Sequence, residues 1–462
     1  MSDLSVDSTA REMAMAVASR RISARELTEL HLARIAERNP ELNAIVSLDE
    51  ERARAGAAQA DEHQASGGPL GPLHGLPFAV KDTHAVAGWR TTYGSPIYAE
   101  HVPDTDDLIV ERVRRGGVVL VGKTNVPEFA AGSHTFNPVF GTTRNPHDVT
   151  RSAGGSSGGA AAALASGMVP LADGSDMGGS LRNPASFCGV VGLRPSLGRV
   201  PTWPAMNQWE STSVGGPLAR NVGDLALLLS VLAGPDARTP LALGEPGFHF
   251  APPLAGTLNG LRIAYSVDLG GLFDVDERVA AVTEAAGRRM ARAGARVFSA
   301  WPDLSLADDT FRTLRAWHFQ ARYGALLARH PDAIKESLAD NIRAGEPLTG
   351  SDIARAYAQR TALGETMRRL FTEYDALVLP VSQVPPFPVD EEYPAEINGR
   401  PMESYLDWMR SAYAITVTGC PAISVPAGTT AEGLPVGIQI VAPHGADRRL
   451  LEIAAAFEAL DP

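Results

Sequence analysis

The residues best suited to chemistry in this chain are serines in two glycine-rich clusters, GGSSGG at 154–159 and GGS at 178–180. Glycines let the backbone approach a ligand closely and turn its N–H groups toward it. A serine hydroxyl becomes a good nucleophile only when a base takes its proton, and acyl transfer also needs donors for the oxyanion. The clusters therefore predict nucleophilic serine chemistry.

The segment between the two clusters is predicted to be a helix followed by a buried strand. An alanine-rich run at 160–166 favours a helix that starts directly from the first cluster. The apolar residues 168–172 favour a short strand ending near Asp173. A flexible Gly/Ser linker would need neither element, so we expect both clusters to lie on tight turns at the ends of regular structure.

A histidine is the usual base of a serine hydrolase. Four of the eleven histidines lie near the clusters in the sequence, namely His74, His84, His134 and His147. None of them is singled out by its spacing, and we expect each to have a structural role.

Lysine is the other candidate base, and it occurs only at Lys81, Lys123 and Lys335. Lys81 directly follows the apolar residues 78–80, which are predicted to form a buried strand. We therefore expect the Lys81 amine to lie inside the protein, although most lysines are exposed.

Two other patterns suggest different chemistries. Residues 154–158 fit G-x-S-x-G, the nucleophile elbow of α/β-hydrolases, so an esterase that uses Ser156 and a histidine is an alternative. That alternative leaves the cluster at 178–180 and Lys81 without a role. Residues 117–124 match the phosphate-loop pattern G-x-x-x-x-G-K-[ST], but the intervening Val-Val-Leu-Val is predicted to be a strand, so we interpret the match as coincidence.

The composition is that of a globular enzyme with a large core: 462 residues, 44% hydrophobic and 20% charged. The net charge is −12 and no run of five or six like charges occurs, so we expect neither nucleic acid nor a membrane as a partner. The N-terminus resembles no signal peptide and no stretch is long and apolar enough to span a bilayer, which predicts a cytoplasmic protein. Cys188 and Cys420 lack metal-ligand spacing, so no metal site is expected.

The rest of the chain alternates between helical and strand patterns. Helices are predicted at 23–38, 50–64, 107–115, 224–232, 276–293, 448–460 and over most of 304–369. Strands are predicted at 261–265, 296–299, 374–380, 422–426 and 436–441. The strand-helix-strand succession over 261–299 is typical of α/β folds with parallel strands.

Several motifs together resemble the amidase signature family. They are GLPFAVKD at 75–82, GKTNVPEF at 122–129, GGSSGG at 154–159, GSDMGGSLR at 174–182, CGVVGLRP at 188–195, GCPAISVP at 419–426 and GLPVGIQ at 433–439. The resemblance spans nearly the whole chain and includes the phosphate-loop match. Ser175 and Leu181 replace the usual threonine and isoleucine, which leaves the chemistry unchanged.

The resemblance implies an α/β fold with a large mixed central β-sheet covered by helices on both faces. It implies one amidase domain over 1–462, with N-terminal helices at 1–70 and a catalytic core at 71–303. A mostly helical cap and loop at 304–400 would cover the site, and 401–462 would return to the core sheet.

The same resemblance assigns the roles in the site: Ser180 as nucleophile, Ser156 as the serine that bridges the proton transfer, and Lys81 as the base. It also implies a cis peptide bond between Gly155 and Ser156. The backbone N–H groups that would form the oxyanion hole are those of Met177, Gly178, Gly179 and Ser180. The side chains expected to support the turns by hydrogen bonding are those of Ser157, Asp176 and Arg182.

This scheme requires Lys81 to be neutral, because an ammonium group has no lone pair with which to accept a proton. Burial lowers the pKa of a lysine, and a drop of about three units costs about 4 kcal/mol. The reaction would be hydrolysis of a carboxamide or carbamate C–N bond through an acyl-enzyme, with a urethanase acting mainly on aryl carbamates as an alternative.

The sequence does not identify the substrate-binding residues. Aromatic side chains that are candidates to line a pocket are Trp203, Trp209, Trp317 and Phe319. We expect a small-molecule amide or carbamate as the partner and no cofactor. Some family members act with partner proteins on tRNA, but the acidic composition argues against that role, and self-association is left open.

Overall fold

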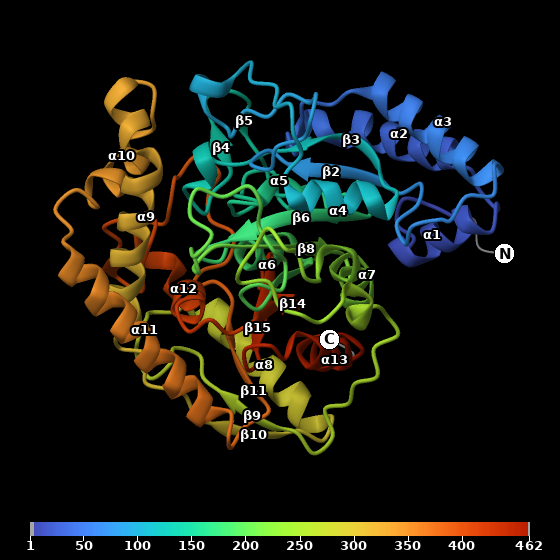
Figure 1. Ribbon diagram of the computed structural model, residues 1–462. Coiled ribbons are helices and arrows are strands. Elements are labelled where there is room, and N and C mark those ends of the chain that lie inside the picture. Colours follow the sequence, from blue (N-terminus) through green and yellow to red (C-terminus); the bar gives the residue numbers. More distant parts are fainter. Residues whose placement is uncertain (1–3, 461–462) are drawn as a thin grey trace.

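The computed structural model describes residues 4–460, and these are organised around an 11-stranded sheet with strand order β1-β3-β2-β6-β8-β7-β14-β15-β11-β9-β10 (Figure 1). The strands of this sheet are β1 (Ile45–Val46), β2 (Pro77–Lys81), β3 (Val119–Thr124), β6 (Leu171–Asp176), β7 (Val191–Arg194), β8 (Val214–Ala219), β9 (Arg262–Tyr265), β10 (Arg296–Ser299), β11 (Ala376–Pro380), β14 (Ala422–Thr429) and β15 (Pro435–Val441). Two short hairpins, β4 (Phe136–Asn137) with β5 (Gly141–Thr142) and β12 (Glu396–Ile397) with β13 (Arg400–Pro401), lie outside it.

The sheet is mixed. Strand β2 pairs in parallel with both β3 and β6, and β9 pairs in parallel with β10 and β11. The strands between these two groups pair antiparallel. The α/β fold with a large mixed sheet is therefore confirmed, as is the parallel pairing expected over 261–299.

Thirteen α-helices occur in the described chain. They are α1 (Ala10–Ala18), α2 (Ala24–Leu42), α3 (Glu50–Ala65), α4 (Leu108–Gly116), α5 (Gly158–Ala165), α6 (Arg182–Cys188), α7 (Val222–Leu232), α8 (Glu277–Arg292), α9 (Ala307–Arg329), α10 (Glu336–Arg343), α11 (Gly350–Leu370), α12 (Arg410–Thr416) and α13 (Asp447–Glu458). Helices α9, α10 and α11 stand together at one side of the molecule, far from the N-terminal helices α1 to α3 (Figure 1).

Helix α2 differs from its predicted bounds. It has the expected capping box of Ser23 and Glu26, but it continues past Pro40 to Leu42. Proline lacks an N–H and disfavours the helical conformation in the residue before it, which is why a stop was expected there. The helix instead ends where Asn43 adopts a left-handed conformation with φ 49°.

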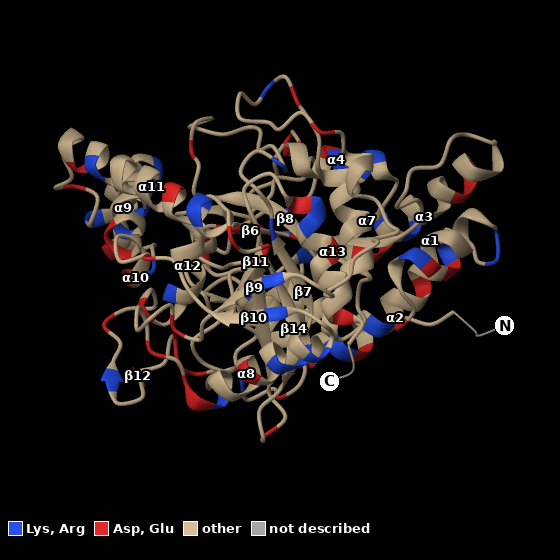
Figure 2. Ribbon diagram, turned by 90° about the horizontal axis from the view of Figure 1, so that it is seen from below, with Lys and Arg blue, Asp and Glu red and all other residues tan. Residues whose placement is uncertain are grey.

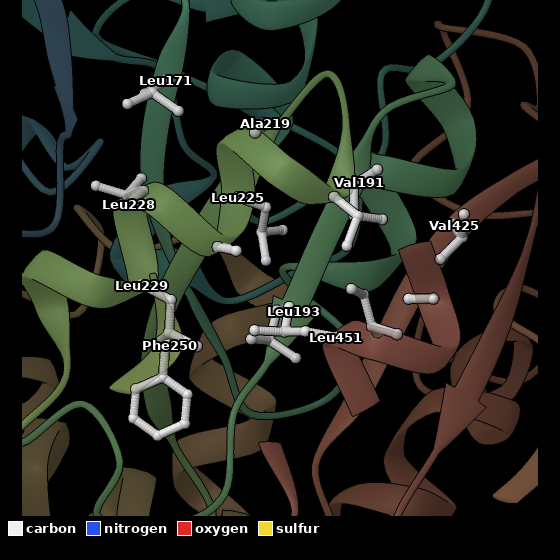
Figure 3. Close-up of a cluster of buried hydrophobic side chains, with 14 of the residues drawn as sticks. Leu171, Val191, Leu193, Ala219, Leu225, Leu228, Leu229, Phe250, Val425 and Leu451 are labelled. Carbon is white, nitrogen blue, oxygen red and sulfur yellow. The ribbon is translucent and has the colours of Figure 1, made fainter. Parts of the chain in front are cut away.

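The largest apolar cluster lies between the middle of the sheet and helices α7 and α13. In Figure 3, Leu225 and Leu228 of α7 face Leu171 of β6 and Val191 of β7, and Leu451 of α13 lies beside them. Burial of these side chains stabilises β6, the strand that leads into the serine cluster at 178–180.

Charged residues of both signs are interspersed over the surface helices (Figure 2). Within residues 4–460, every helix is too short or too polar to cross a bilayer.

Candidate active site

The two serine clusters lie at opposite ends of the helix-strand unit that was predicted between them. Ser156 and Ser157 immediately precede α5, and Ser180 lies on the turn between β6 and α6. Helix α5 is buried, and its alanines allow close packing on every side. At Gly159 a Cβ would lie 2.3 Å from the backbone nitrogen of Asn125, so only glycine fits there.

Strand β2 ends at Lys81 and places its side chain beside the serine cluster at 154–159. The Lys81 side chain is fully buried, and its Nζ lies 2.8 Å from Oγ of Ser156, 2.9 Å from Oγ of Ser157 and 3.0 Å from Oγ of Ser175. The expectation that this lysine is interior is confirmed. Its three polar neighbours are all hydroxyl groups.

Burial lowers the pKa of Lys81 to about 7, although the carboxylates of Asp173 and Asp176 oppose this shift. Desolvation has this effect because it penalises the ammonium form more than the neutral amine. A substantial fraction of Lys81 is therefore neutral at neutral pH and able to accept a proton.

Ser156, Ser175 and Ser180 line one cavity of about 230 Å³. The peptide bond between Gly155 and Ser156 is cis, as the resemblance implied. The N–H of Ser157 donates to the carbonyl of Ser180 at 3.2 Å, which joins the two clusters. Among the hydrogen bonds of residues 4–460, none joins the hydroxyls of Ser156 and Ser180.

The turn after β6 contains backbone N–H groups without a partner in the described chain, and its Met177 and Ser180 line the cavity. None of the hydrogen bonds in the described chain uses the N–H of Met177, Gly178 or Ser180. The N–H of Gly179, however, donates to Oδ1 of Asp176 at 2.9 Å. Three of the four expected oxyanion donors are thus available, and the fourth holds the turn.

Asp176 is the centre of a buried ionic cluster behind this turn. Its carboxylate accepts hydrogen bonds from Nε and Nη2 of Arg182 and from the N–H of Leu181. Burial would raise the pKa of Asp176, but Arg182 and Arg194 outweigh it and hold the pKa below its ordinary value. Arg182 also donates to the carbonyl of Ala412, so the cluster ties the turn to α12.

His84, for which only a structural role was expected, forms a pair with the carboxylate of Asp173 that its place in the sequence did not indicate. His84 lines the cavity, and its Nδ1 lies 2.5 Å from Oδ2 of Asp173. The other carboxylate oxygen of Asp173 accepts the N–H of Lys81 at 3.0 Å. His134 and His147, in contrast, bond backbone carbonyls, the structural role expected of them.

Five aromatic side chains are among the residues that line the cavity. They are Tyr93, Phe129, Trp203, Phe319 and Tyr323. Trp203 and Phe319 were expected there. The expectation was wrong for Trp209 and Trp317, because Trp209 is 65% exposed and Trp317 packs against Tyr357 instead.

The other two lysines have structural partners. Lys123 lies in strand β3. A phosphate loop would be irregular at this point, so the match of residues 117–124 to that pattern is a coincidence, as expected. Nζ of Lys123 lies 3.4 Å from Asp82 and donates to the carbonyl of His84. Lys335 pairs with Glu392 at 3.0 Å.

Comparisons with known proteins agree over nearly the full chain. A family model described as Amidase matches residues 26–451. An acylamidase from Rhodococcus erythropolis is 38% identical over 457 residues, which cover 98% of this chain and 95% of the relative. A glutamyl-tRNA(Gln) amidotransferase subunit from Acidothermus cellulolyticus is 36% identical over 502 residues, covering 99% of this chain and 95% of the relative.

Solved structures of similar fold include a bacterial aryl acylamidase described as belonging to the amidase signature enzymes. It has a TM-score of 0.90 at 31% identity, and the match covers 98% of this chain and 96% of that one. A 6-aminohexanoate cyclic dimer hydrolase, complexed with substrate, has a TM-score of 0.89 at 29% identity, with 98% and 97% covered.

Proposed function

The chain belongs to the amidase signature family, whose members hydrolyse amide C–N bonds, and from this premise we propose that Ser180 is its nucleophile, Lys81 its base and Ser156 the proton bridge. The observation that carries the proposal is the contact of 2.8 Å between the buried Lys81 amine and the Ser156 hydroxyl, at the edge of a cavity that Ser180 also lines.

In the proposed reaction neutral Lys81 takes the proton of Ser156, and Ser156 takes the proton of Ser180. The Ser180 oxygen then attacks the substrate carbonyl carbon, and the negative charge that develops on the carbonyl oxygen meets free N–H groups of the turn after β6. Preorganised donors of this kind stabilise the transition state more than the ground state.

The C–N bond breaks as the proton returns through Ser156 to the nitrogen, because an amide anion is a very poor leaving group. The amine departs and leaves an ester between the acyl group and Ser180. A water molecule then attacks this ester with Lys81 and Ser156 acting as before, which releases the acid and restores the free serine.

We propose aryl amides and aryl carbamates as the substrate class. The aromatic wall of the cavity supports this choice, because rings such as Phe129 and Tyr323, whose centroids lie 4.8 Å apart, offer faces and edges to an aryl group. A carbamate differs from an amide by an alkoxy group on the acyl side, so the same serine and lysine would serve a urethanase.

An esterase that uses Ser156 and a histidine is a weaker alternative. In residues 4–460 no histidine forms a hydrogen bond with the Ser156 hydroxyl, whose side-chain partner is Lys81. His84 lines the cavity and pairs with Asp173, but Asp173 joins this pair to the backbone of Lys81 and not to Ser156.

The experiment that tests the proposed function measures aniline release from acetanilide and from ethyl N-phenylcarbamate, which share one leaving amine. We expect both to be hydrolysed and Ser180→Ala to abolish the release. Ser166→Ala is the matched control, because this serine at the end of α5 bonds only its own helix. Aniline release that survives in Ser180→Ala would refute the assignment of the nucleophile.

A further inference from the structure

One face of helix α9 forms a wall of the cavity. Its members occupy positions i, i+3, i+4, i+7 and i+8 and so project from the same side of the helix: Arg315, His318, Phe319, Arg322 and Tyr323. This face carries two arginines together with aromatic side chains.

Arg315 is buried without a counter-ion. Its side chain is 5% exposed, and no carboxylate of residues 4–460 lies within 4.0 Å of it. Its hydrogen-bond partners are Oδ1 of Asn341, Sδ of Met177 and the hydroxyl oxygen of Tyr405. Buried charges are ordinarily paired, because removing a charge from water is costly. The hydrogen-bond partners of Arg315 are neutral, and its guanidinium lies 4.0 Å from the ring centroid of Phe319, so aromatic rings, but no carboxylate of the described chain, face its positive charge.

Arg322 stands on the same face at the exposed end of the cavity. It forms no ion pair with any described residue, and its guanidinium lies 5.4 Å from the ring centroid of Tyr323. Arg312, which does not line the cavity, makes a useful contrast because it is paired with Asp308 at 3.0 Å and also with Asp407. Neither of the α9 arginines that line the cavity is thus paired with a carboxylate of the described chain.

The carboxylates that line the cavity are already engaged. Glu210 accepts the N–H groups of Thr212 and Ser213 within its own loop. Asp107 accepts the N–H of Ala85, and burial raises its pKa, which favours its neutral form. Neither carboxylate is within 4.0 Å of the two arginines.

His318 lies between the two arginines along the helix. Burial lowers its pKa; Glu210 opposes this shift, while Arg322 and Arg315 add to it. The lowered pKa favours the neutral imidazole, so the arginines supply most of the positive charge of this wall.

We propose that the cavity binds aryl substrates whose non-reacting part carries a carboxylate, with Arg315 and Arg322 as the groups that recognise it. This inference rests on the proposed function, since it names the substrate class of that same site. Guanidinium groups bind carboxylates through charge-assisted and often bidentate hydrogen bonds. The rings of Phe319 and Tyr323, between and beside the two arginines, would hold the apolar part of the substrate.

The test measures binding and does not depend on turnover. Isothermal titration calorimetry of the unmodified chain compares two pairs of aryl ketones, which cannot be hydrolysed: 3-benzoylpropionate with butyrophenone, and 4-acetylbenzoate with 4-methylacetophenone. We expect the acid of at least one pair to bind about 10-fold or more tightly than its neutral partner, as charge-assisted hydrogen bonds imply.

Arg322→Gln and Arg315→Gln should each reduce this preference at least about threefold and leave the neutral ketones within about twofold of their original affinity. Arg329→Gln is the control, because this exposed arginine of α9 bonds only a carbonyl of its own helix. If Arg315→Gln fails to fold, Arg322→Gln decides the question alone.

The inference is wrong if both acids bind no more tightly than their neutral partners, or if the preference survives the Arg322 substitution. Failure of the proposed function would be visible separately, as absence of aniline release from neutral acetanilide by the unmodified chain.

Discussion

At the scale of the residue, the proposed chemistry depends on a buried amine surrounded by hydroxyl groups. Burial of the Lys81 amine lowers the stability of the fold, because the charged form has no adjacent carboxylate. The same burial makes a neutral amine available as a base near pH 7. The carboxylates that act on it, Asp173 and Asp176, do so at longer range than hydrogen bonds to Nζ.

The first prediction concerns pH. Because only the neutral amine accepts a proton, kcat/KM for acetanilide should fall as the pH drops below about 7, following the pKa of about 7 for Lys81. A pH profile of initial rates measures this limb. Activity that stays constant down to pH 5 would show that Lys81 is not the base.

A second prediction concerns the amine itself. Lys81→Ala should lower kcat/KM by a factor of about 10² to 10⁴, the usual contribution of a general base. Steady-state kinetics with aniline detection measures the change, and circular dichroism checks that the variant is folded. A loss of less than tenfold in a folded variant would contradict the role of Lys81.

A third prediction concerns the ionic cluster behind the oxyanion turn. Asp176→Asn leaves Arg182 and Arg194 as buried charges without their counter-ion, so the free energy of unfolding should fall by about 3–5 kcal/mol. Urea denaturation measures it. Glu365→Gln, on the exposed surface of α11, should change stability little, and equal effects of the two substitutions would contradict this account.

Lys81 and both serine clusters could be predicted from the sequence, because glycine content, apolar flanking residues and the scarcity of lysine are local signals. The pair of His84 and Asp173 could not be predicted, since these residues come from different parts of the chain. Neither has a spacing that indicates the other, and only the pairing of β2 with β6 places them together.

At the scale of the element, close backbone approach fixes the start of α5 and with it the position of Ser156 and Ser157. Helix α5 starts against the segment after β3, and Gly159 is the point of contact. The predicted helix and strand between the serine clusters are both present, because alanine content and an apolar run are local signals. The aromatic residues of the 201–213 loop have no periodicity, so which of Trp203 and Trp209 faces the cavity was not predictable.

A fourth prediction tests this contact. In Gly159→Ala the new Cβ would lie 2.7 Å from the carbonyl oxygen of Ala44 and closer still to Asn125, both backbone atoms that cannot move freely. The free energy of unfolding should fall by about 3 kcal/mol, and aniline release should fall with it.

The matched control is Gly364→Ala in helix α11, where the new Cβ would have only one neighbour, at 3.8 Å. This substitution should raise stability by roughly 0.5–1 kcal/mol, because alanine favours a helix over glycine. Urea denaturation compares the two variants, and equal changes would contradict the packing argument.

At the scale of the whole molecule, strands of one mixed sheet position the candidate site, and helix α9 lines one wall of its cavity. The sequence predicted most strands of this sheet but not their order, because pairings such as β7 with β14 join segments more than 200 residues apart and depend on the whole fold. The family resemblance, not the strand patterns, supplied the expectation of a mixed sheet.

The fifth prediction concerns partners. Some relatives are named as subunits of a tRNA-dependent amidotransferase, but this chain has a net charge of −12 with basic and acidic residues interspersed (Figure 2). Binding of nucleic acid depends on cations that neutralise phosphates. The purified chain alone should therefore hydrolyse acetanilide. Fluorescence anisotropy should detect no binding of tRNA at about 150 mM salt, a concentration at which ions weaken such binding. Activity that requires tRNA or a second protein would contradict this.

The most direct test of the central claim is to locate the acyl group during turnover. A slowly hydrolysed aryl carbamate is mixed with the chain, the reaction is quenched in acid, and the peptides are analysed by tandem mass spectrometry. Because the C–N bond breaks and the amine leaves, we predict an alkoxycarbonyl group on Ser180 that is absent from Ser180→Ala. An alkoxycarbonyl group on Ser156 instead would contradict the account and favour the elbow-type hydrolase.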